Sequence, residues 1–227
     1  MKTIIVIGGS RGIGNAILSK LVLTSKVINI SRTTPEVQHA NLTHYTCDIT
    51  QDNLPVIDTA DSLIYCPGSI NLKPISRLSI DDFKNDFEIN VLGAVKAIQY
   101  YLPILKNGTT PSILLFSTVA VKMGMPFHAS IATAKAGVEG LVKSLGAELA
   151  PNIRVNAIAP TVTDTDLALK LLRNEKMIAN ISERHPLKKF LLPDEVAEMA
   201  LFLISHKAAS MSGQIIEMDC GIVSFKI

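Results

Sequence analysis

The stretch Gly8-Gly9-Ser10-Arg11-Gly12-Ile13-Gly14 lies between an apolar run, residues 3–7, and a segment of helical periodicity, residues 12–23. Glycines at positions 8, 12 and 14 permit a tight turn and a close approach of the backbone to a pyrophosphate. The N-terminus of the following helix supplies free N–H groups and a favourable dipole for the same anion. A glycine cluster can also be a plain structural turn. Its position after a strand and before a helix predicts a dinucleotide-binding turn.

Short apolar runs alternate with helical patterns along the rest of the chain. Strands are predicted over residues 3–7, 26–30, 62–66, 112–117, 153–157 and 214–218, and helices over 12–23, 80–104, 127–150 and 193–205. Nearly continuous apolar strands separated by helices are typical of a parallel sheet covered on both faces. We therefore expect the α/β class: a doubly wound parallel sheet in a three-layer α/β/α arrangement, with residues 1–227 as one domain.

Two polar stretches fit this pattern less well. Residues 33–45 are short and carry no clear apolar stripe, so any crossover helix there is expected to be brief. Residues 163–189 are predicted to form a helical lid or loop outside the sheet.

Composition narrows the possible partners. Hydrophobic residues make up 48% and charged residues 19% of the 227 positions, which excludes intrinsic disorder. The net charge of +2, without a basic run, gives no indication of a nucleic-acid partner. No apolar run approaches the ~20 residues that span a bilayer, and the start is too short for a secretory signal. The three cysteines, Cys47, Cys66 and Cys220, fit neither a disulfide framework nor a metal site, so the expected setting is a reducing cytoplasm without a bound metal.

Further motifs resemble the short-chain dehydrogenase/reductase family over almost the whole chain. Residues 7–14 are similar to its Thr-Gly-x3-Gly-x-Gly turn, with Ile7 in place of the threonine. Cys47-Asp48-Ile49 resembles the segment whose aspartate contacts adenine in the family. Tyr65-Cys66-Pro67-Gly68 stands where the family has Asn-Asn-Ala-Gly and keeps only the glycine. Residues 154–160 and 213–221 resemble the approach to the nicotinamide loop and the final strand and turn.

The resemblance implies a Rossmann-type fold and a nicotinamide cofactor. The implied cofactor-binding residues are Gly8, Ser10, Arg11, Gly12, Ile13, Gly14, Ser31, Arg32, Asp48, Ile49, Gly68, Asn90, Lys135, Pro160, Val162 and Thr165. An acidic residue at the end of the second strand binds the 2′-hydroxyl of NAD, whereas an arginine accommodates the 2′-phosphate of NADP. Ser31 and Arg32 stand there, and Arg11 is a second cation within reach. We therefore predict NADP; the alternative is that both arginines are ordinary solvated charges.

The predicted catalytic set departs from the family pattern. Lys135 shares a predicted helical stripe with apolar residues, so it must either extend to solvent or have a defined partner. In the family that partner is the nicotinamide ribose. The family also places an acid tyrosine four residues earlier, where this chain has Ile131. Asn90 matches the family asparagine, and Thr118 stands at the family serine.

His128 is the candidate substitute for the missing acid. It lies seven residues before Lys135, two helical turns away, if Pro126 opens the helix. Histidine suits proton delivery near neutral pH. The spacing is similar to the Tyr-x6-Lys pattern of the enoyl-thioester reductases, although the glycine turn is not theirs. The alternative is that His128 is simply a pocket-lining or surface residue.

Two functions from different classes follow. The first is an NADP-dependent oxidoreductase that transfers hydride to a small carbonyl or conjugated C=C substrate with an atypical proton donor. The alternative is a catalytically silent NADP-binding protein, a sensor or a non-catalytic subunit. Thr161 and Cys220, which replace family glycines, could reshape the nicotinamide loop. A homodimer or homotetramer is expected through helices 80–104 and 127–150, with contacts from Tyr100, Tyr101, Leu102 and Leu145.

Overall fold

A parallel seven-stranded sheet forms the centre of the computed structural model, which describes residues 1–169 and 171–225. The strand order is β3-β2-β1-β4-β5-β6-β7. The strands are β1 (Thr3–Ile7), β2 (Lys26–Ser31), β3 (Leu42–Thr46), β4 (Ser62–Tyr65), β5 (Ser112–Phe116), β6 (Arg154–Pro160) and β7 (Ile215–Met218). The predicted doubly wound α/β class is confirmed.

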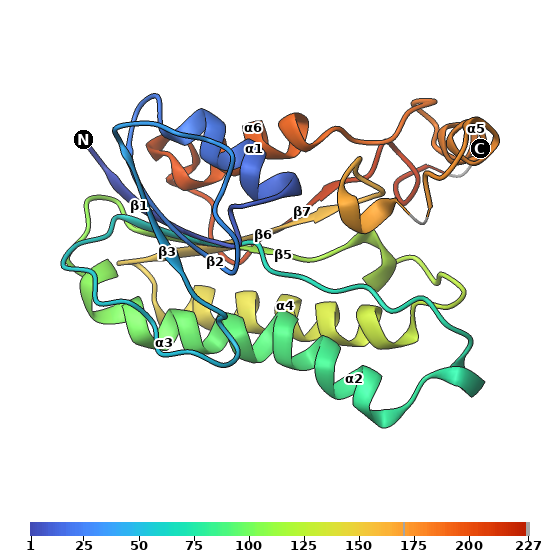
Figure 1. Ribbon diagram of the computed structural model, residues 1–227, viewed down its shortest axis with the longest axis horizontal. Helices are drawn as coiled ribbons and strands as arrows, with labels where there is room; N and C mark the ends of the chain where they lie inside the picture. The colour runs from blue at the N-terminus through green and yellow to red at the C-terminus, as the bar shows by residue number, and fades with distance from the viewer. Residues whose placement is uncertain (170, 226–227) are drawn as a thin grey trace.

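Helices cover both faces of the sheet (Figure 1). They are α1 (Gly12–Leu21), α2 (Ile80–Phe87), α3 (Gly93–Leu105), α4 (Ala129–Glu148), α5 (Glu175–Arg184) and α6 (Pro193–Ile204). Figure 1 shows α2, α3 and α4 beneath the sheet and α1 and α6 above it. Ile5 and Ile7 point into one buried cluster, and Ile4 and Val6 into the other. Because both sides of each central strand are buried, the strands read as continuous apolar runs.

Strand β3 was not among the strands predicted from apolar runs. It forms the edge of the sheet, and most of its side chains are partly or fully exposed. An edge strand needs no continuous apolar run, so its sequence is polar. Residues 32–41 lead into it without a helix, and α5 lies outside the sheet, as expected for residues 163–189.

The predicted helix over 80–104 is interrupted by a π-helical turn, Glu88–Leu92, between α2 and α3. The Tyr65 hydroxyl donates to the carbonyl oxygen of Ile89 over 2.6 Å, which satisfies a backbone acceptor in the wider turn. A Cβ atom on Gly93 would lie 2.2 Å from that hydroxyl oxygen. Glycine at 93 therefore makes room for Tyr65. Single π turns inside α-helices are frequent at functional sites.

This contact predicts opposite effects of one substitution in two backgrounds. In the native chain, Gly93→Ala should lower the free energy of unfolding by about 1–3 kcal/mol, because Tyr65 must leave the partly buried Ile89 carbonyl unpaired. In a Tyr65→Phe background the same change should be neutral or raise it by up to ~1 kcal/mol, the helix-propensity gain of alanine over glycine. Urea unfolding of the four proteins measures the coupling. Equal effects of Gly93→Ala in both backgrounds would contradict it.

Candidate functional site

The candidate site lies at the carboxyl ends of the strands, where the strand order reverses. Strand β1 pairs with β2 on one side and with β4 on the other. In open α/β sheets, ligands bind in the crevice outside such a switch point. The loops that follow β1, β4, β5 and β6 carry most of the residues predicted for the site.

The glycine turn has the backbone that a close approach requires. Gly8 and Gly12 adopt φ angles of +78° and +51°, in the left-handed region that favours glycine. A Cβ on Gly14 would lie 2.2 Å from the carbonyl oxygen of Gly8, so α1 packs against the turn only with glycine there. Ile13 follows in the first turn of α1, which contains no acidic residue. The free N–H groups of this helix start are available to an anion.

Loops distant in sequence close around the glycine turn. A Cβ on Gly12 would lie 3.1 Å from the Thr165 methyl, and one on Gly8 would lie 3.0 Å from Pro67. Gly68 follows Pro67 in the chain. A Cβ on Gly68 would lie 3.4 Å from Asn90 Oδ1 and 3.8 Å from Lys135 Nζ. The structure thus brings together predicted cofactor residues from five segments.

At the end of β2, the predicted phosphate-binding residues differ in their surroundings. Ser31 is buried, accepts from Asn29 and donates to the carbonyl oxygen of Thr33 over 2.9 Å, so its hydroxyl shapes the turn. The Thr33 hydroxyl donates to Ser10 and joins this turn to the glycine loop, a link that the sequence did not indicate. Arg32 is exposed and makes no ion pair within the described residues.

Arg11 is likewise exposed at the N-cap of α1 and makes no ion pair within the described part of the chain.

The turn after β3 holds Asp48 and Ile49. The hydroxyl and amide of Thr50 donate to the Asp48 carboxylate and lower its pKa; the nearby Arg32 contributes less to the same shift. Lys96 of α3 donates to the carbonyl oxygen of Ile49 over 2.9 Å and so holds the turn against α3. Asp48 is therefore an ionised hydrogen-bond acceptor, fixed by Thr50, near the predicted binding place of the cofactor's adenosine.

Lys135 is buried in α4 and donates to the carbonyl oxygen of Phe116 over 2.7 Å. The alternative of a lysine reaching into solvent is thus wrong. Burial lowers the pKa of Lys135 to about 8, and burial raises the pKa of the Cys66 thiol to about 12. A thiol that keeps its proton so firmly is a poor nucleophile, so Cys66, which packs partly buried against the core, is not a candidate catalytic residue.

The place of the family tyrosine is filled by an apolar side chain. Ile131 is 4% exposed, one helical turn before Lys135. Thr118 follows β5, is half-buried, and accepts from the Ala120 amide over 3.3 Å. Within the described residues its hydroxyl donates no hydrogen bond, so its proton remains available to a ligand.

His128 lies just outside α4. The helix begins at Ala129, so the expectation that Pro126 opens it is wrong: Phe127 has a φ of +69°, which no helix permits, and His128 is the N-cap. His128 Nδ1 lies 2.7 Å from the carbonyl oxygen of Pro126. Because a carbonyl only accepts, Nδ1 carries a hydrogen, and within the described residues Nε2 makes no hydrogen bond.

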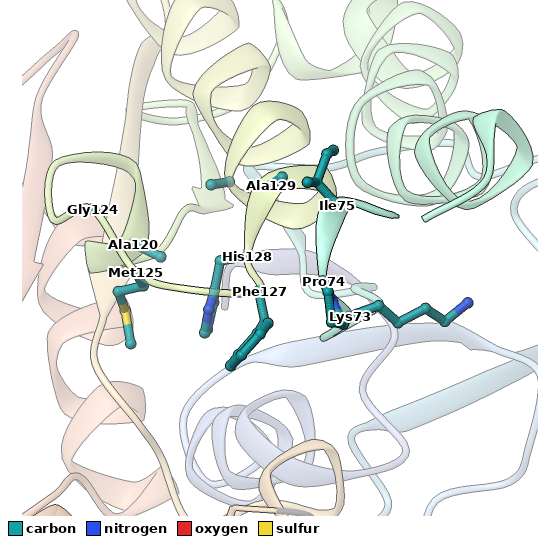
Figure 2. Close-up of a pocket in the computed structure, with 10 residues that line it drawn as sticks. Lys73, Pro74, Ile75, Ala120, Gly124, Met125, Phe127, His128 and Ala129 are labelled. Atoms are coloured by element: carbon teal, nitrogen blue, oxygen red, sulfur yellow. The ribbon is translucent and has the colours of Figure 1, made fainter. Parts of the chain in front are cut away.

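His128 lines a pocket of about 490 Å³. Figure 2 shows its ring and that of Phe127 projecting to the same side of the loop. The pocket is otherwise mostly apolar, lined by Lys73, Pro74, Ile75, Ala120, Gly124, Met125, Ala129 and Ala132. Lys73 pairs with Asp82, so its charge is already compensated.

The loop after β6 is tied to α5 by a buried pair. The Thr161 hydroxyl and His185 Nε2 are 2.8 Å apart, and His185 Nδ1 lies 2.7 Å from the carbonyl oxygen of Ile181. Pro160 ends β6, and the Val162 carbonyl accepts from the Leu191 amide. The glycine that the family has at this position carries no hydroxyl. Thr161 therefore adds a link between the loop after β6 and α5.

Cys220 adopts a φ of +51°, the conformation of the glycine that it replaces.

A buried polar cluster was not predicted. The Asp86 carboxylate, fully buried, accepts from Ser69, Asn71 and Ser130, and Asn90 donates to Ser69. Its members are too scattered in sequence for any motif; the one available signal was a carboxylate one turn before Asn90 on a helix.

The residues present fit a nicotinamide dinucleotide. The glycines leave a cradle that side chains would fill, and the two exposed arginines lie beside its adenosine end. Among the residues that the structure describes, buried Asn90 Oδ1 has no hydrogen-bond partner. In residues 1–169 and 171–225, no three His, Cys, Asp or Glu side chains gather as metal ligands. Nor does any helix in those ranges have the length and apolar character to cross a membrane.

Comparison with known proteins is consistent with this site. A family model described as Enoyl-(Acyl carrier protein) reductase matches residues 36–223. The chain is 30% identical to a 3-oxoacyl-(acyl-carrier-protein) reductase of Aquifex aeolicus, over 97% of both chains. It is 28% identical to a 2,5-dichloro-2,5-cyclohexadiene-1,4-diol dehydrogenase of Sphingobium indicum, over 98% of this chain and 97% of that protein.

Solved structures are similar in fold. The ligand-free aldohexose dehydrogenase of Thermoplasma acidophilum superposes with a TM-score of 0.90 at 28% identity, covering 99% of this chain and 95% of that one.

Proposed function

Because the chain belongs to the short-chain dehydrogenase/reductase family of oxidoreductases, we propose that it uses NADP to reduce a small carbonyl or conjugated C=C substrate. The proton in this reaction comes from a group other than tyrosine. The observation that carries the proposal is the convergence of Lys135, Asn90 and Gly68 beside an intact glycine turn.

The residues of the site divide the work as follows. Bound NADPH would supply the hydride and leave as NADP+. Lys135, which is buried and donates to the Phe116 carbonyl, would also donate to the cofactor ribose, and the Thr118 hydroxyl would donate a hydrogen bond to the substrate oxygen. His128, whose Nδ1–H donates to the Pro126 carbonyl, lines the pocket; as an imidazolium it would carry a second proton on Nε2 and deliver that proton to the substrate, leaving the neutral ring.

NADP rather than NAD is supported by the charges at the end of β2. Ser31 stands where NAD-binding chains carry a carboxylate, and Arg32 and Arg11 are exposed, without ion pairs within the described residues. A guanidinium binds a phosphate through paired hydrogen bonds and gains little from a ribose hydroxyl.

Arg32→Ala should raise the Kd for NADPH about 10- to 100-fold, equivalent to the ~1.5–3 kcal/mol of a hydrogen bond to a charged group. The Kd for NADH should barely change. Fluorescence titration of both cofactors measures the split, and Lys26→Ala, an exposed cation at the other end of β2, is the control. Equal affinity of the native protein for NADPH and NADH would refute the assignment.

We propose that the substrate enters the pocket lined by His128, which favours an uncharged and largely apolar molecule. Its lining is mainly aliphatic and aromatic, and its lysine is paired. Reduction of a conjugated C=C bond fits His128-x6-Lys135 with an apolar residue at 131, and the family model that matches is described as an enoyl reductase. Ketone reduction with His128 or water as proton source is the second option.

One observation favours a silent cofactor-binding protein instead: Ile131 fills the place of the family acid and is buried. The retained Lys135, Asn90 and Thr118 favour an enzyme. The two functions differ in one measurable property, the oxidation of bound NADPH by a substrate.

We also propose self-association through the face formed by α2, α3 and α4. Tyr101 is buried and donates to the Pro55 carbonyl, so it belongs to the core and not to this surface. The exposed large apolar side chains on α2, the π turn and α3 are Ile80, Phe87, Leu92 and Tyr100. Exposed apolar groups that gather on one face are typical of an interface.

A homodimer or homotetramer should therefore appear by light scattering at micromolar concentration. Tyr100→Glu combined with Leu92→Glu should shift it toward the monomer, because charges would be buried unpaired. Phe202→Glu, at a similarly exposed apolar site on α6 across the sheet, serves as control. A monomeric native mass would contradict the proposal.

A further inference from the structure

The side chain of Asn90 is held in one orientation. Its Nδ2 donates to the carbonyl oxygen of Asp86 over 2.7 Å and to Ser69 Oγ over 3.0 Å. A carbonyl only accepts, so the atom facing it must be the nitrogen, and the amide cannot be reversed. Both Nδ2 hydrogens are therefore committed, and Oδ1 points the other way.

Asp86 is the reason why Ser69 acts as an acceptor for Asn90. The Ser69 hydroxyl donates its one hydrogen to Asp86 Oδ1 over 2.5 Å, which leaves its lone pairs for Asn90. Ser130 donates to Asp86 Oδ2 over 2.6 Å and Asn71 to Oδ1 over 3.0 Å. Asp86 is fully buried, and the three side chains that donate to its carboxylate are all uncharged. The cluster ties α2, α4 and the loop after β4 to one carboxylate.

Asn90 Oδ1 is a buried acceptor without a partner in the structure. It lies 3.4 Å, and Lys135 Nζ 3.8 Å, from the position that a Cβ on Gly68 would occupy. Buried polar atoms are nearly always paired, so an unpaired one needs an explanation. Here it lies on the β4 side of the switch point, away from the adenosine end at Arg32 and Asp48.

We propose that Asp86 is a positioning residue: acting through Ser69, it fixes the Asn90 amide so that Oδ1 accepts a hydrogen bond from the nicotinamide half of the cofactor. That half carries suitable donors, its ribose hydroxyls and its carboxamide N–H. The inference rests on the proposed use of NADP. It assigns Asp86, Ser69 and the Asn90 side-chain oxygen a joint role in holding this half of the ligand.

Two single substitutions separate positioning from stability. Ser69→Ala and Asn71→Ala each remove one donor to Asp86 Oδ1, but only Ser69 contacts Asn90. Their effects on thermal unfolding should be similar. Ser69→Ala should raise the Kd for NADPH about 3- to 10-fold, the loss of one neutral hydrogen bond, while Asn71→Ala should change it less than about twofold.

The second probe is adenosine 2′,5′-bisphosphate, which carries the adenosine end of NADPH and lacks nicotinamide. Its Kd, measured by calorimetry, should be the same for the native protein, Ser69→Ala and Asn71→Ala. Asp86→Asn, which keeps the shape of the side chain and weakens its hold on the Ser69 hydrogen, should behave like Ser69→Ala with both probes.

The outcomes distinguish the two proposals. If Ser69→Ala binds NADPH as the native protein does, or if both alanine variants weaken NADPH equally, the positioning role is wrong and the proposed function stands. If Ser69→Ala weakens the bisphosphate as much as NADPH, the cluster only supports the fold, and the positioning role is again wrong. If the native protein binds neither probe, the proposed cofactor is wrong and this inference falls with it.

Discussion

Replacing His128 with alanine should lower turnover by ~10²-fold or more, because positioned general acids typically contribute ~10²–10⁴-fold. The affinity for NADPH should be unchanged, since His128 lines the pocket proposed for the substrate, which includes no residue of the glycine turn. His206→Ala, at an exposed histidine on another part of the fold, is the matched control and should keep full turnover. Unchanged turnover in His128→Ala would dismiss the histidine as proton donor.

Ile131→Tyr is the companion variant. It restores the family acid beside Lys135, leaving Thr118 as the departure from the usual set. The residue is buried, so the larger ring should also cost ~1–3 kcal/mol of stability through overpacking. It should create or raise ketone reduction. If ketones remain inert while the variant folds and binds NADPH, the pocket is not that of a carbonyl reductase.

Lys135→Met should be the second large loss, with kcat/KM falling ~10²–10³-fold, the range for removing one preorganised donor. Unlike His128→Ala, it should also weaken NADPH binding, because the ammonium is buried beside Gly68. Lys143→Met, on the exposed side of the same helix, controls for helix propensity and charge. Native affinity for NADPH in Lys135→Met would remove the lysine from the cofactor site.

Because the pKa of Lys135 is lowered, the loss of its charge should be visible in the pH dependence of kcat/KM. Burial disfavours the charged form and lowers the pKa of Lys135 to about 8. The ammonium is therefore present below about pH 8 and is lost as the pH rises through that value. Since kcat/KM reports groups of the free enzyme, it should fall above about pH 8. A profile that stays flat to about pH 10, near the ordinary pKa of a lysine, would contradict this.

The fold could be predicted from the sequence because its central strands are buried on both sides. Ile4 to Ile7 pack alternately into the two clusters, which leaves a continuous apolar run as a clear signal. Strand β3 was not predicted because an edge strand does not need side chains that are buried on both sides, so its sequence has no apolar run. The π turn was not predicted because it depends on Tyr65 packing against Gly93, and these two residues are 28 positions apart in the sequence.

The cofactor site could be predicted in part because its residues form contiguous motifs, such as the glycine turn. The departures needed the structure. Ser31 turned out to hold its own backbone turn, and His128 lies at the helix start and not within the helix. The cluster around Asp86 is assembled from single polar residues of three segments, each of which is an ordinary surface residue type when read alone.

Single-turnover oxidation of bound NADPH tests the central claim most directly. The protein is loaded with NADPH, mixed with enones, enoyl thioesters or ketones, and the decay of the NADPH absorbance is followed. At least one class should oxidise the bound cofactor in the native protein, at a rate that His128→Ala reduces by ~10²-fold or more. Tight NADPH binding with no oxidation by any class, in the native protein and in Ile131→Tyr alike, would contradict an oxidoreductase and identify a silent cofactor-binding protein.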